Sequence, residues 1–295
     1  MENSLLALSN ELAALAARAG QGVVAVHGRP RIPSSGILWR SGVVVTAEHA
    51  LRREEDLRVT LPDGSTIAAE LAGRDPGTDL AVLKIKSDTS PEWKTSAAPQ
   101  CGNLIMAIGR SADTGVNAAM GVVSSVAGPW HTWRGGKVDQ FLRLDVGLYP
   151  GSSGGAIVDA EGRLLGLATS GLSRTSIIAV PAVTIARVLD ELLEKGHVAR
   201  GYLGVGLQPI GLPEPQKGGL IVISVEPDGP AARAGLVLGD ILLAIGGKSI
   251  GSVEDLQEAL GAGTAGKTVS MSLMRGGQPA QVDVTIGERP RRRPA

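Results

Sequence analysis

The chain has 295 residues and carries 29 Lys and Arg against 29 Asp and Glu, so its formal net charge is zero. No bulk charge therefore favours nucleic acid as a partner, and no apolar run approaches the roughly 18 residues that suggest a membrane span. Cys101 is the single cysteine, so an intrachain disulfide and a Cys-rich metal site are excluded. The Cys101 side chain is expected to be a small buried residue. No metal and no cofactor are expected.

Residues 1–20, MENSLLALSNELAALAARAG, predict an N-terminal helical segment, because leucines recur at spacings of 3, 4 and 3 on one helix face. The stripe is expected to pack on the body of the protein, with self-association as the alternative. An acidic second residue and the polar break at Ser9, Asn10 and Glu11 do not fit a secretory signal. A cytoplasmic protein is expected for the chain as written, and a periplasmic one if the chain is a mature or truncated form.

Two series of strand-like segments, separated by the Ser-, Thr- and Pro-rich residues 87–99, occupy the next part of the chain. β-branched runs bounded by turn residues predict strands, and two series of similar size suggest two packed barrels. We therefore expect a mostly β, double-barrel domain over residues 21–185. The predicted strands are 22–26, 37–45, 57–61, 67–72 and 80–85, then 104–108, 118–126, 141–146, 156–158, 164–169 and 177–180.

The pattern changes after Pro181, where AVTIARVLDELLEKG has apolar residues at helical spacing and ends at Gly196, a plausible cap. A linker helix is assigned to 186–198. A compact α+β unit follows at 199–287, in which Ser252 and Asp255 resemble a capping box at the start of helix 252–260. Residues 288–295 form a basic segment that predicts a disordered tail.

The stretch YPGSSGGAIVD, residues 149–159, suggests a nucleophile on a tight turn, although a Gly/Ser linker has a similar composition. A serine nucleophile at Ser153 needs a base and an orienting acid. His49 is the best candidate base, because it directly follows the apolar strand GVVVTA, whereas His27, His131 and His197 lie in loops. Asp79 opens the run LAVLKI and needs a partner if buried; a turn-capping role is the alternative.

Several ordered segments resemble the HtrA/Deg family of trypsin-like serine proteases with one C-terminal PDZ domain. They include SGVVVTAEHA, TDLAVLKI, LRLDVGLYPGSSGGAIVDAEGRLLGLATSG and GGLIVISVEPDGPAARAGLVLGDILLAIGGKSI, and together they cover nearly all of residues 22–287. The order His-Asp-Ser also matches chymotrypsin-like proteases. The resemblance implies a chymotrypsin-like double β-barrel followed by a PDZ domain, a partly open barrel.

The resemblance implies that Ser153 attacks the peptide carbonyl, His49 transfers the proton and Asp79 orients the imidazole. Backbone N–H groups of Gly151, Ser152 and Ser153 would form the oxyanion hole. Leu148 and Leu172 would line an apolar pocket for the residue before the cut.

Three places depart from the family pattern, and none removes a member of the proposed triad. Ser152 stands where the family usually has Asn. Glu48 precedes the histidine in place of Asn or Ala, and the loop that begins at Arg110 replaces Asn-Pro-Phe-Gly. Because this loop supports the active site in the family, the departures raise the question of whether the oxyanion turn needs an activator.

The resemblance also implies peptide binding by the PDZ unit, through strand addition at a sheet edge. The residues concerned are Tyr202, Leu203, Gly204, Val205, Gly206 and Leu207, with Val253, Leu256 and Leu260 on the opposite helix. The alternative is that these apolar residues only build the domain.

The implied function is an ATP-independent serine endopeptidase of protein quality control. The chain has no GxxxxGK[ST] phosphate loop. Expected partners are unfolded or misfolded proteins and C-terminal peptides, with a homotrimer by analogy to the family. The alternative function is a latent or weak protease that acts mainly as a peptide-binding, chaperone-like scaffold.

Overall fold

A computed structural model describes residues 4–89, 91–95, 99–213, 218–261 and 263–288. The chain divides into two compact units, one ending at Val198 and the other beginning at Ala199. The predicted tail, apart from Glu288, and residues 1–3 of the predicted N-terminal segment lie outside the described residues. Each unit has its own hydrophobic core.

The N-terminal helix α1 (Ser4–Gly20) packs on the first unit through its C-terminal half only. Leu15 is buried with 3% of its surface exposed, and Leu12 lies against the same core. Leu5 and Leu8 belong to the same predicted stripe but are 75% and 52% exposed. The predicted packing therefore holds for the last turns of the helix and not for the first.

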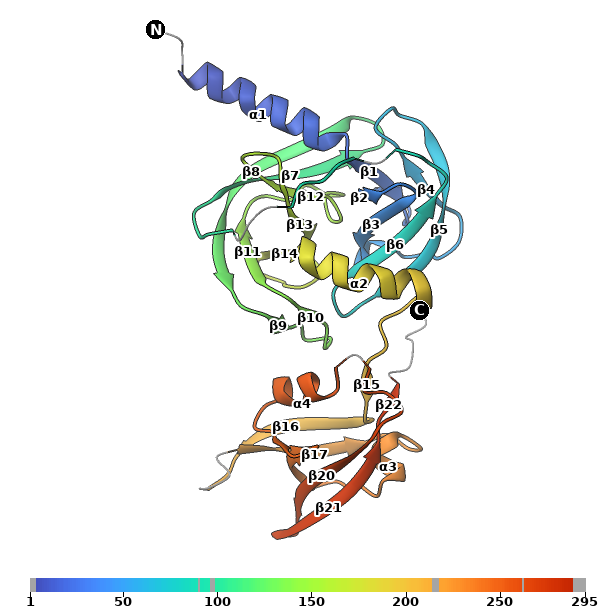
Figure 1. Cartoon of the computed structure of the whole chain (residues 1–295), viewed down its shortest axis with the longest axis vertical. Helices are drawn as coiled ribbons and strands as arrows, with labels where there is room; N and C mark the ends of the chain where they lie inside the picture. Colours follow the sequence, from blue (N-terminus) through green and yellow to red (C-terminus); the bar gives the residue numbers. More distant parts are fainter. Residues whose placement is uncertain (1–3, 90, 96–98, 214–217, 262, 289–295) are drawn as a thin grey trace. The chain divides into compact units, whose positions relative to one another are not determined.

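The first barrel consists of β1 (Val23–His27), β2 (Ser34–Arg40), β3 (Val43–Ala47), β4 (Leu57–Thr60), β5 (Thr66–Asp75) and β6 (Leu80–Ile85). The strands close in the order β1-β2-β3-β6-β5-β4, all antiparallel (Figure 1). β3 lies beside β6, so the chain segments that end or begin these two strands meet at one edge, with Ala47 opposite Leu80.

The second barrel consists of β7 (Leu104–Ser111), β8 (Gly115–Ala127), β11 (Phe141–Asp145), β12 (Ala156–Asp159), β13 (Leu164–Thr169) and β14 (Ile177–Pro181). It closes in the order β11-β14-β13-β12-β7-β8, and β9 (Trp130–His131) pairs with β10 (Lys137–Val138) outside it. The predicted pair of barrels is confirmed. The expectation for Cys101 is wrong, because this residue is exposed at the turn before β7 and its thiol lies 3.3 Å from the Ser124 carbonyl oxygen.

Helix α2 (Ala182–Lys195) begins four residues before the range assigned to the linker helix and packs on the barrels (Figure 1). Its buried residues, which include Ile185, Val188 and Leu192, join a core cluster with side chains from both barrels and α1. Gly196 ends the helix with φ of 75°, the left-handed conformation that glycine adopts without a Cβ clash.

The described part of the second unit has a main sheet, a two-stranded sheet and two short helices. Its strands are β16 (Val205–Gly211), β17 (Gly218–Val225), β18 (Ile241–Ile245), β20 (Thr268–Arg275) and β21 (Gln278–Thr285), in that order, with β19 (Lys248–Ser249) beside β18. β15 (Gly201–Tyr202) pairs with β22 (Gly287–Glu288). The helices are α3 (Pro230–Arg233) and α4 (Val253–Ala259).

The N-terminus of α4 has the predicted capping box. The Ser252 side chain accepts from the Asp255 N–H at 3.1 Å, and the Asp255 carboxylate accepts from the Ser252 N–H at 2.9 Å. These backbone donors lower the pKa of Asp255, with the Gly251 N–H as the largest cause.

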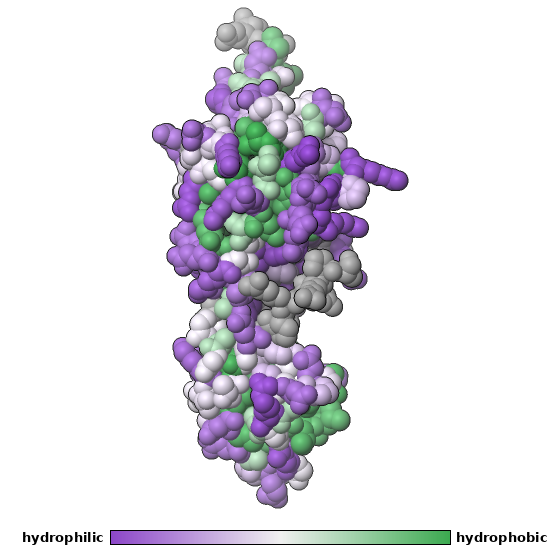
Figure 2. Space-filling model, turned by 90° about the vertical axis from the view of Figure 1, so that its right-hand side faces the viewer, coloured by the Kyte–Doolittle hydropathy of each residue, from purple (hydrophilic) through white to green (hydrophobic). Residues whose placement is uncertain are grey.

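Exposed apolar side chains remain on both units, interspersed with hydrophilic ones over the face seen in Figure 2.

Candidate active site

His49 and Asp79 meet at the edge where β3 and β6 pair. His49 lies in a short 3-10 helix, Glu48–Ala50, that follows β3, and Asp79 immediately precedes β6. His49 Nδ1 lies 2.8 Å from Asp79 Oδ2 and 3.1 Å from Oδ1, and the His49 backbone N–H donates to Oδ1 at 2.9 Å. Asp79 adopts φ of 57°, a left-handed conformation that Asp tolerates better than most residues. The carboxylate therefore orients the imidazole through two groups of the same residue.

The Asp79 side chain is only 2% exposed, so its charge depends on hydrogen bonds within the protein. Thr169, at the end of β13, donates its hydroxyl to Oδ2 and accepts the Gly171 N–H at 2.8 Å. A Cβ at Gly171 would lie 2.5 Å from Asp79 Oδ2 and 2.6 Å from His49 Nδ1. The segment after β13 therefore passes directly against the His49–Asp79 pair from the second barrel.

Ser153 follows a tight turn closed by a hydrogen bond from the Ser152 N–H to the Tyr149 carbonyl at 2.9 Å. Pro150 and Gly151 occupy its centre, and Gly151 has φ of 94°, the arrangement of a type II turn. Among the described hydrogen bonds, none uses the N–H of Gly151 or of Ser153. These two donors can receive an oxyanion.

The prediction that Ser152 supplies a third oxyanion donor is wrong, because closure of the turn uses its N–H. Ser152 contributes its side chain instead, which donates to Asn117 Oδ1 at 3.0 Å.

The hydroxyl of Ser153 lies 3.2 Å from the hydroxyl of Ser170, the first residue after β13. No hydrogen bond between the described residues joins Ser153 to His49. Ser170 directly precedes Gly171, which lies against His49 and Asp79, so Ser153 lies near that pair with its hydroxyl toward Ser170.

Glu48, which replaces the usual family residue before the histidine, forms ion pairs next to His49. Its carboxylate lies 2.9 Å from Arg74 and 3.8 Å from Arg134, with 12% of the side chain exposed. Burial raises the pKa of Glu48, and Arg74 offsets part of that rise. Arg134 also stacks 4.5 Å above the centre of the Trp133 ring.

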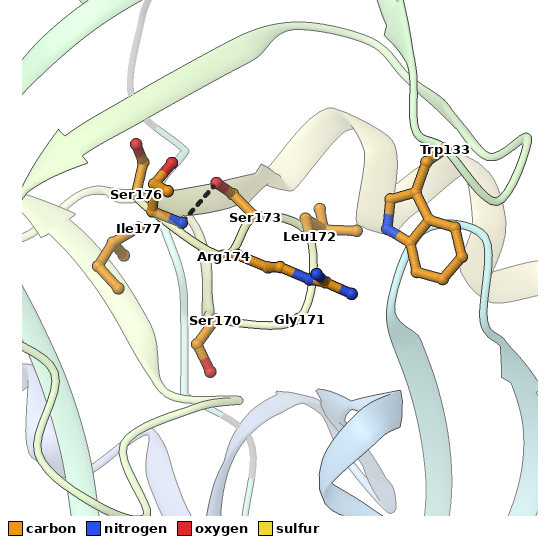
Figure 3. A pocket seen from close by; sticks show the side chains of 9 residues that line it. Trp133, Ser170, Gly171, Leu172, Ser173, Arg174, Ser176 and Ile177 are labelled. Carbon is orange, nitrogen blue, oxygen red and sulfur yellow. Dashed lines mark hydrogen bonds between the residues drawn. The ribbon is translucent and has the colours of Figure 1, made fainter.

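A pocket of about 760 Å³ opens beside Ser170 and is bounded by Trp133 and the segment 170–177 (Figure 3). Leu172 is among its lining residues and is 7% exposed. Leu148 instead packs against the core of the second barrel and does not line this pocket. The two leucines predicted to form one subsite therefore lie in different surroundings.

In the second unit, the predicted peptide-binding residues lie around the free edge of the sheet. β16 holds Val205, Gly206 and Leu207, pairs with β17 on one side, and is the last strand of its sheet. Among the described hydrogen bonds, none uses the N–H groups of Leu203 and Gly204, which precede the strand. Two adjacent N–H donors of this kind can hold a carboxylate.

Helix α4 faces this edge, but not all of its predicted contact residues are accessible to a peptide. Leu256 is buried in the core of the second unit, whereas Val253 and Leu260 pack against that core and stay partly exposed. Leu203 is likewise buried, and the Tyr202 hydroxyl donates to the Glu226 carboxylate. Of the three predicted contact residues, Val253 in α4 and Leu260 at its C-cap keep part of their surface accessible.

Sequence reasoning missed Thr169, Ser170 and Asn117, which reach the site from the second barrel. For Thr169 and Ser170, the only local signal was a polar residue at the end of an apolar strand, as Thr169 ends LLGLAT. Asn117 lies within a strand and its sequence neighbours give no sign of its contact with Ser152. Among the described residues, no group of His, Cys, Asp and Glu could hold a metal ion.

Two closed barrels that bring a serine on a tight turn to a His–Asp pair define the class of chymotrypsin-like serine peptidases. The family model of the trypsin-like peptidase domain matches residues 34–167, and the PDZ domain model matches residues 201–286. The serine endoprotease from Yersinia pestis is 31% identical, with a TM-score of 0.78 over 94% of this chain and 98% of that one.

Two further comparisons agree. The HtrA-type protease AlgW with a tripeptide is 30% identical, with a TM-score of 0.77 over 95% of this chain and 98% of that one. A probable periplasmic serine endoprotease, DegP-like, from Brucella suis biovar 1 (strain 1330) is 32% identical over 287 residues. The match covers 90% of this chain and 54% of the relative, so the chain spans about half the length of the curated relatives it matches. The chain belongs to the HtrA family of trypsin-like serine proteases.

Proposed function

We propose that the chain is an ATP-independent serine endopeptidase that cleaves unfolded or misfolded proteins. Ser153 is the nucleophile, His49 the general base and then general acid, and Asp79 the group that holds the imidazole. The observation that carries the proposal is the His49–Asp79 pair, joined at 2.8 Å, beside a serine whose turn leaves two N–H donors unused. Those donors, on Gly151 and Ser153, stabilise the oxyanion, each contributing about 3–4 kcal/mol by comparison with other enzymes.

Hydrolysis of an unfolded protein by the wild type and by Ser153→Ala tests this proposal. Ser124→Ala is the matched control, because Ser124 is a partly exposed serine of the second barrel whose hydroxyl donates to the Arg143 carbonyl at 3.1 Å. We expect hydrolysis by the wild type and Ser124→Ala and none by Ser153→Ala. Equal inactivity of all three, with apolar C-terminal peptides added as activators, would favour the alternative of a chaperone-like scaffold.

An apolar subsite beside the nucleophile is part of the proposal. Leu172, in the wall of the pocket beside Ser170, favours small or medium aliphatic side chains before the cut, whereas Leu148, which packs on the core of the second barrel, is not part of this subsite. Cleavage-site profiling should show aliphatic residues before the cut. A charged preference there would remove this assignment.

The PDZ unit binds C-terminal peptides with apolar last residues. The unused N–H groups of Leu203 and Gly204 receive the carboxylate, the edge of β16 receives the peptide backbone, and the partly exposed Val253 contacts the last side chain. AlgW, a solved relative, has one structure with a tripeptide and one with a decapeptide. The same unit recruits substrates or responds to their ends.

Fluorescence anisotropy of a labelled apolar peptide with full-length Ser153→Ala tests this binding. A peptide with a free C-terminus should bind and an amidated one should not, because the N–H groups of Leu203 and Gly204 need a carboxylate to bind. Val253→Lys should weaken binding at least tenfold, whereas Val237→Lys, at a 47% exposed position of the same unit outside α4 and β16, should leave it unchanged. Equal binding of both peptides would argue against the carboxylate site.

We also infer a periplasmic location, because the curated relatives are named as periplasmic endoproteases. The expectation of a cytoplasmic protein is not supported. None of the described helices is long and apolar enough to cross a membrane. A homotrimer is proposed by analogy with the family; cell fractionation tests the location and mass measurement in solution tests the assembly.

A further inference from the structure

Two departures from the family pattern meet in the structure behind the oxyanion turn. Ser152 stands where the family usually has Asn, and Arg110 stands at the start of the loop that usually reads Asn-Pro-Phe-Gly. Both residues are buried, with 5% and 7% of their surfaces exposed. Buried polar residues of this kind need specific partners, and their partners identify what the substitutions do.

The partner of Ser152 is Asn117, on strand β8. The Ser152 hydroxyl donates to Asn117 Oδ1 at 3.0 Å, and Asn117 lies opposite Gly109 in the β7–β8 pairing. A Cβ at Gly109 would lie 2.5 Å from Asn117 Oδ1 and 3.0 Å from the Ser152 hydroxyl. The carboxamide is therefore packed over a glycine. The family usually has a side-chain amide at the turn position. Here the amide belongs to Asn117 on strand β8, and the turn residue Ser152 supplies a hydroxyl.

Ser35, at the start of β2, holds the same turn from the first barrel. Its hydroxyl donates to the Gly151 carbonyl at 2.8 Å, and its N–H donates to the Ser153 carbonyl at 3.0 Å. The Gly155 N–H donates to the Ser152 carbonyl at 3.0 Å. Because each peptide unit is planar and trans, fixing the Ser152 carbonyl on one side directs the Ser153 N–H to the other side.

Arg110 anchors Ser35 in turn. The Arg110 backbone N–H donates to the Ser35 hydroxyl at 2.9 Å. Its guanidinium donates to the Val23 carbonyl at 2.6 Å and the Gly20 carbonyl at 2.8 Å, which ties β7 to β1 and to the end of α1. The three carbonyls around the turn are thus held by contacts that involve no ligand.

We propose that Asn117 is a positioning residue for the oxyanion hole, acting through Ser152, and that with Ser35 it holds the turn ready in the absence of an activating peptide. The inference rests on the proposed peptidase function, since the turn matters to catalysis only if Ser153 is the nucleophile. Asn117 touches no substrate. It acts by restricting the conformations of the turn that carries the two donors.

Kinetics of full-length Asn117→Ala on a short peptide substrate, without any PDZ ligand, form the first test. Loss of one oxyanion donor costs about 10²–10³ in kcat, so a loosened turn should cost about 10–100-fold, with KM within about twofold. Affinity for a peptide aldehyde, which forms a tetrahedral adduct, should fall by the same factor. Asn103→Ala is the matched control, because it removes an Asn side chain that accepts from the Gln100 N–H at 2.7 Å, away from the turn.

Exchange of the two side chains is the second test. Ser152→Asn alone should lose activity, because its longer side chain meets Asn117 above Gly109. The double variant Ser152→Asn with Asn117→Ser returns the amide to the turn and should recover to within about fivefold of the wild type. Recovery of this kind is not expected if the two residues only add separate increments of stability.

Amide NMR separates failure of this inference from failure of the proposed function. In a Ser153→Ala background, the amide signals of positions 151 and 153 should shift or broaden when Asn117→Ala is added, and not when Asn103→Ala is added. This readout holds whether or not the wild type cleaves anything. Unchanged signals together with unchanged kcat in Asn117→Ala, or an equal loss in Asn103→Ala, would overturn the assignment. If Asn117→Ala does not fold, Ser152→Ala removes the same bond from the other side.

Discussion

Removal of the Thr169 hydroxyl should slow catalysis while preserving the shape of the site. Thr169 is fully buried and donates to the Asp79 carboxylate, which is 2% exposed and has His49 as its other partner. A hydrogen bond to a charged group contributes about 1.5–3 kcal/mol. Val has nearly the same shape as Thr, so Thr169→Val isolates the hydroxyl.

The expected magnitude follows from these contacts. If the lost bond is felt mainly when the imidazole becomes charged, the barrier rises by about 1.5–3 kcal/mol, which is about 10–160-fold in kcat. Since Asp79 keeps the backbone N–H of His49 at 2.9 Å and its Nδ1 at 2.8 Å, the loss should not be complete. Thr169→Ser retains a hydroxyl and should remain within a few fold of the wild type.

The assay is steady-state hydrolysis of a peptide substrate, with thermal unfolding measured in parallel. Thr184→Val is the matched control, because Thr184 is also fully buried and donates to the Asp139 carboxylate at 2.9 Å, outside the site. It should lower stability and leave kcat unchanged. Wild-type kcat in a folded Thr169→Val would refute the reasoning, as would an equal loss in the Thr184 variant.

Three other changes test the environment of the site and the core. Because burial raises the pKa of Glu48, its charged form costs stability once the pH passes above its ordinary value of about 4.3. The stability of the wild type relative to Glu48→Gln should therefore fall in thermal melts as the pH rises above that value. Gly154→Ala should abolish hydrolysis, because a Cβ at this position would lie 2.1 Å from the Ser35 carbonyl at φ of 92°, and an active variant would contradict the turn geometry. Leu192→Ala should lose about 2–5 kcal/mol in denaturant unfolding, whereas Leu8→Ala, at a 52% exposed position, should stay within about 0.5 kcal/mol.

The sequence permits prediction of the site where each signal is local. His49 and Asp79 each adjoin an apolar strand, and β3 and β6 happen to be neighbours, so two local signals meet in space. The Gly-Ser turn is local as well. Thr169 and Asn117 were not predicted because their roles depend on which strand of the second barrel passes behind the turn. The residues next to them in the sequence do not determine that strand order.

The fold shows the same division between local and non-local information. Strand positions and the capping box of α4 follow from alternation and turn chemistry within a few residues. The exposure of Cys101 and of Leu5 does not, because burial depends on what the rest of the chain brings opposite. Composition favours burial for both residues, but in the described part of the chain both side chains stay exposed.

The resting site combines a fixed oxyanion turn with a serine side chain that is not yet aligned. The turn is held by Ser35, Asn117 and Gly155, whereas the Ser153 hydroxyl has, among the described residues, a single hydrogen bond of 3.2 Å to Ser170. A neutral hydrogen bond of this kind contributes about 0.5–1.5 kcal/mol, and a side-chain rotation takes picoseconds to nanoseconds. Reorienting the turn would require breaking several partly buried hydrogen bonds together. If Ser153 is the nucleophile, as we propose, we therefore expect activation to begin with rotation of its side chain away from Ser170, while the turn stays in place.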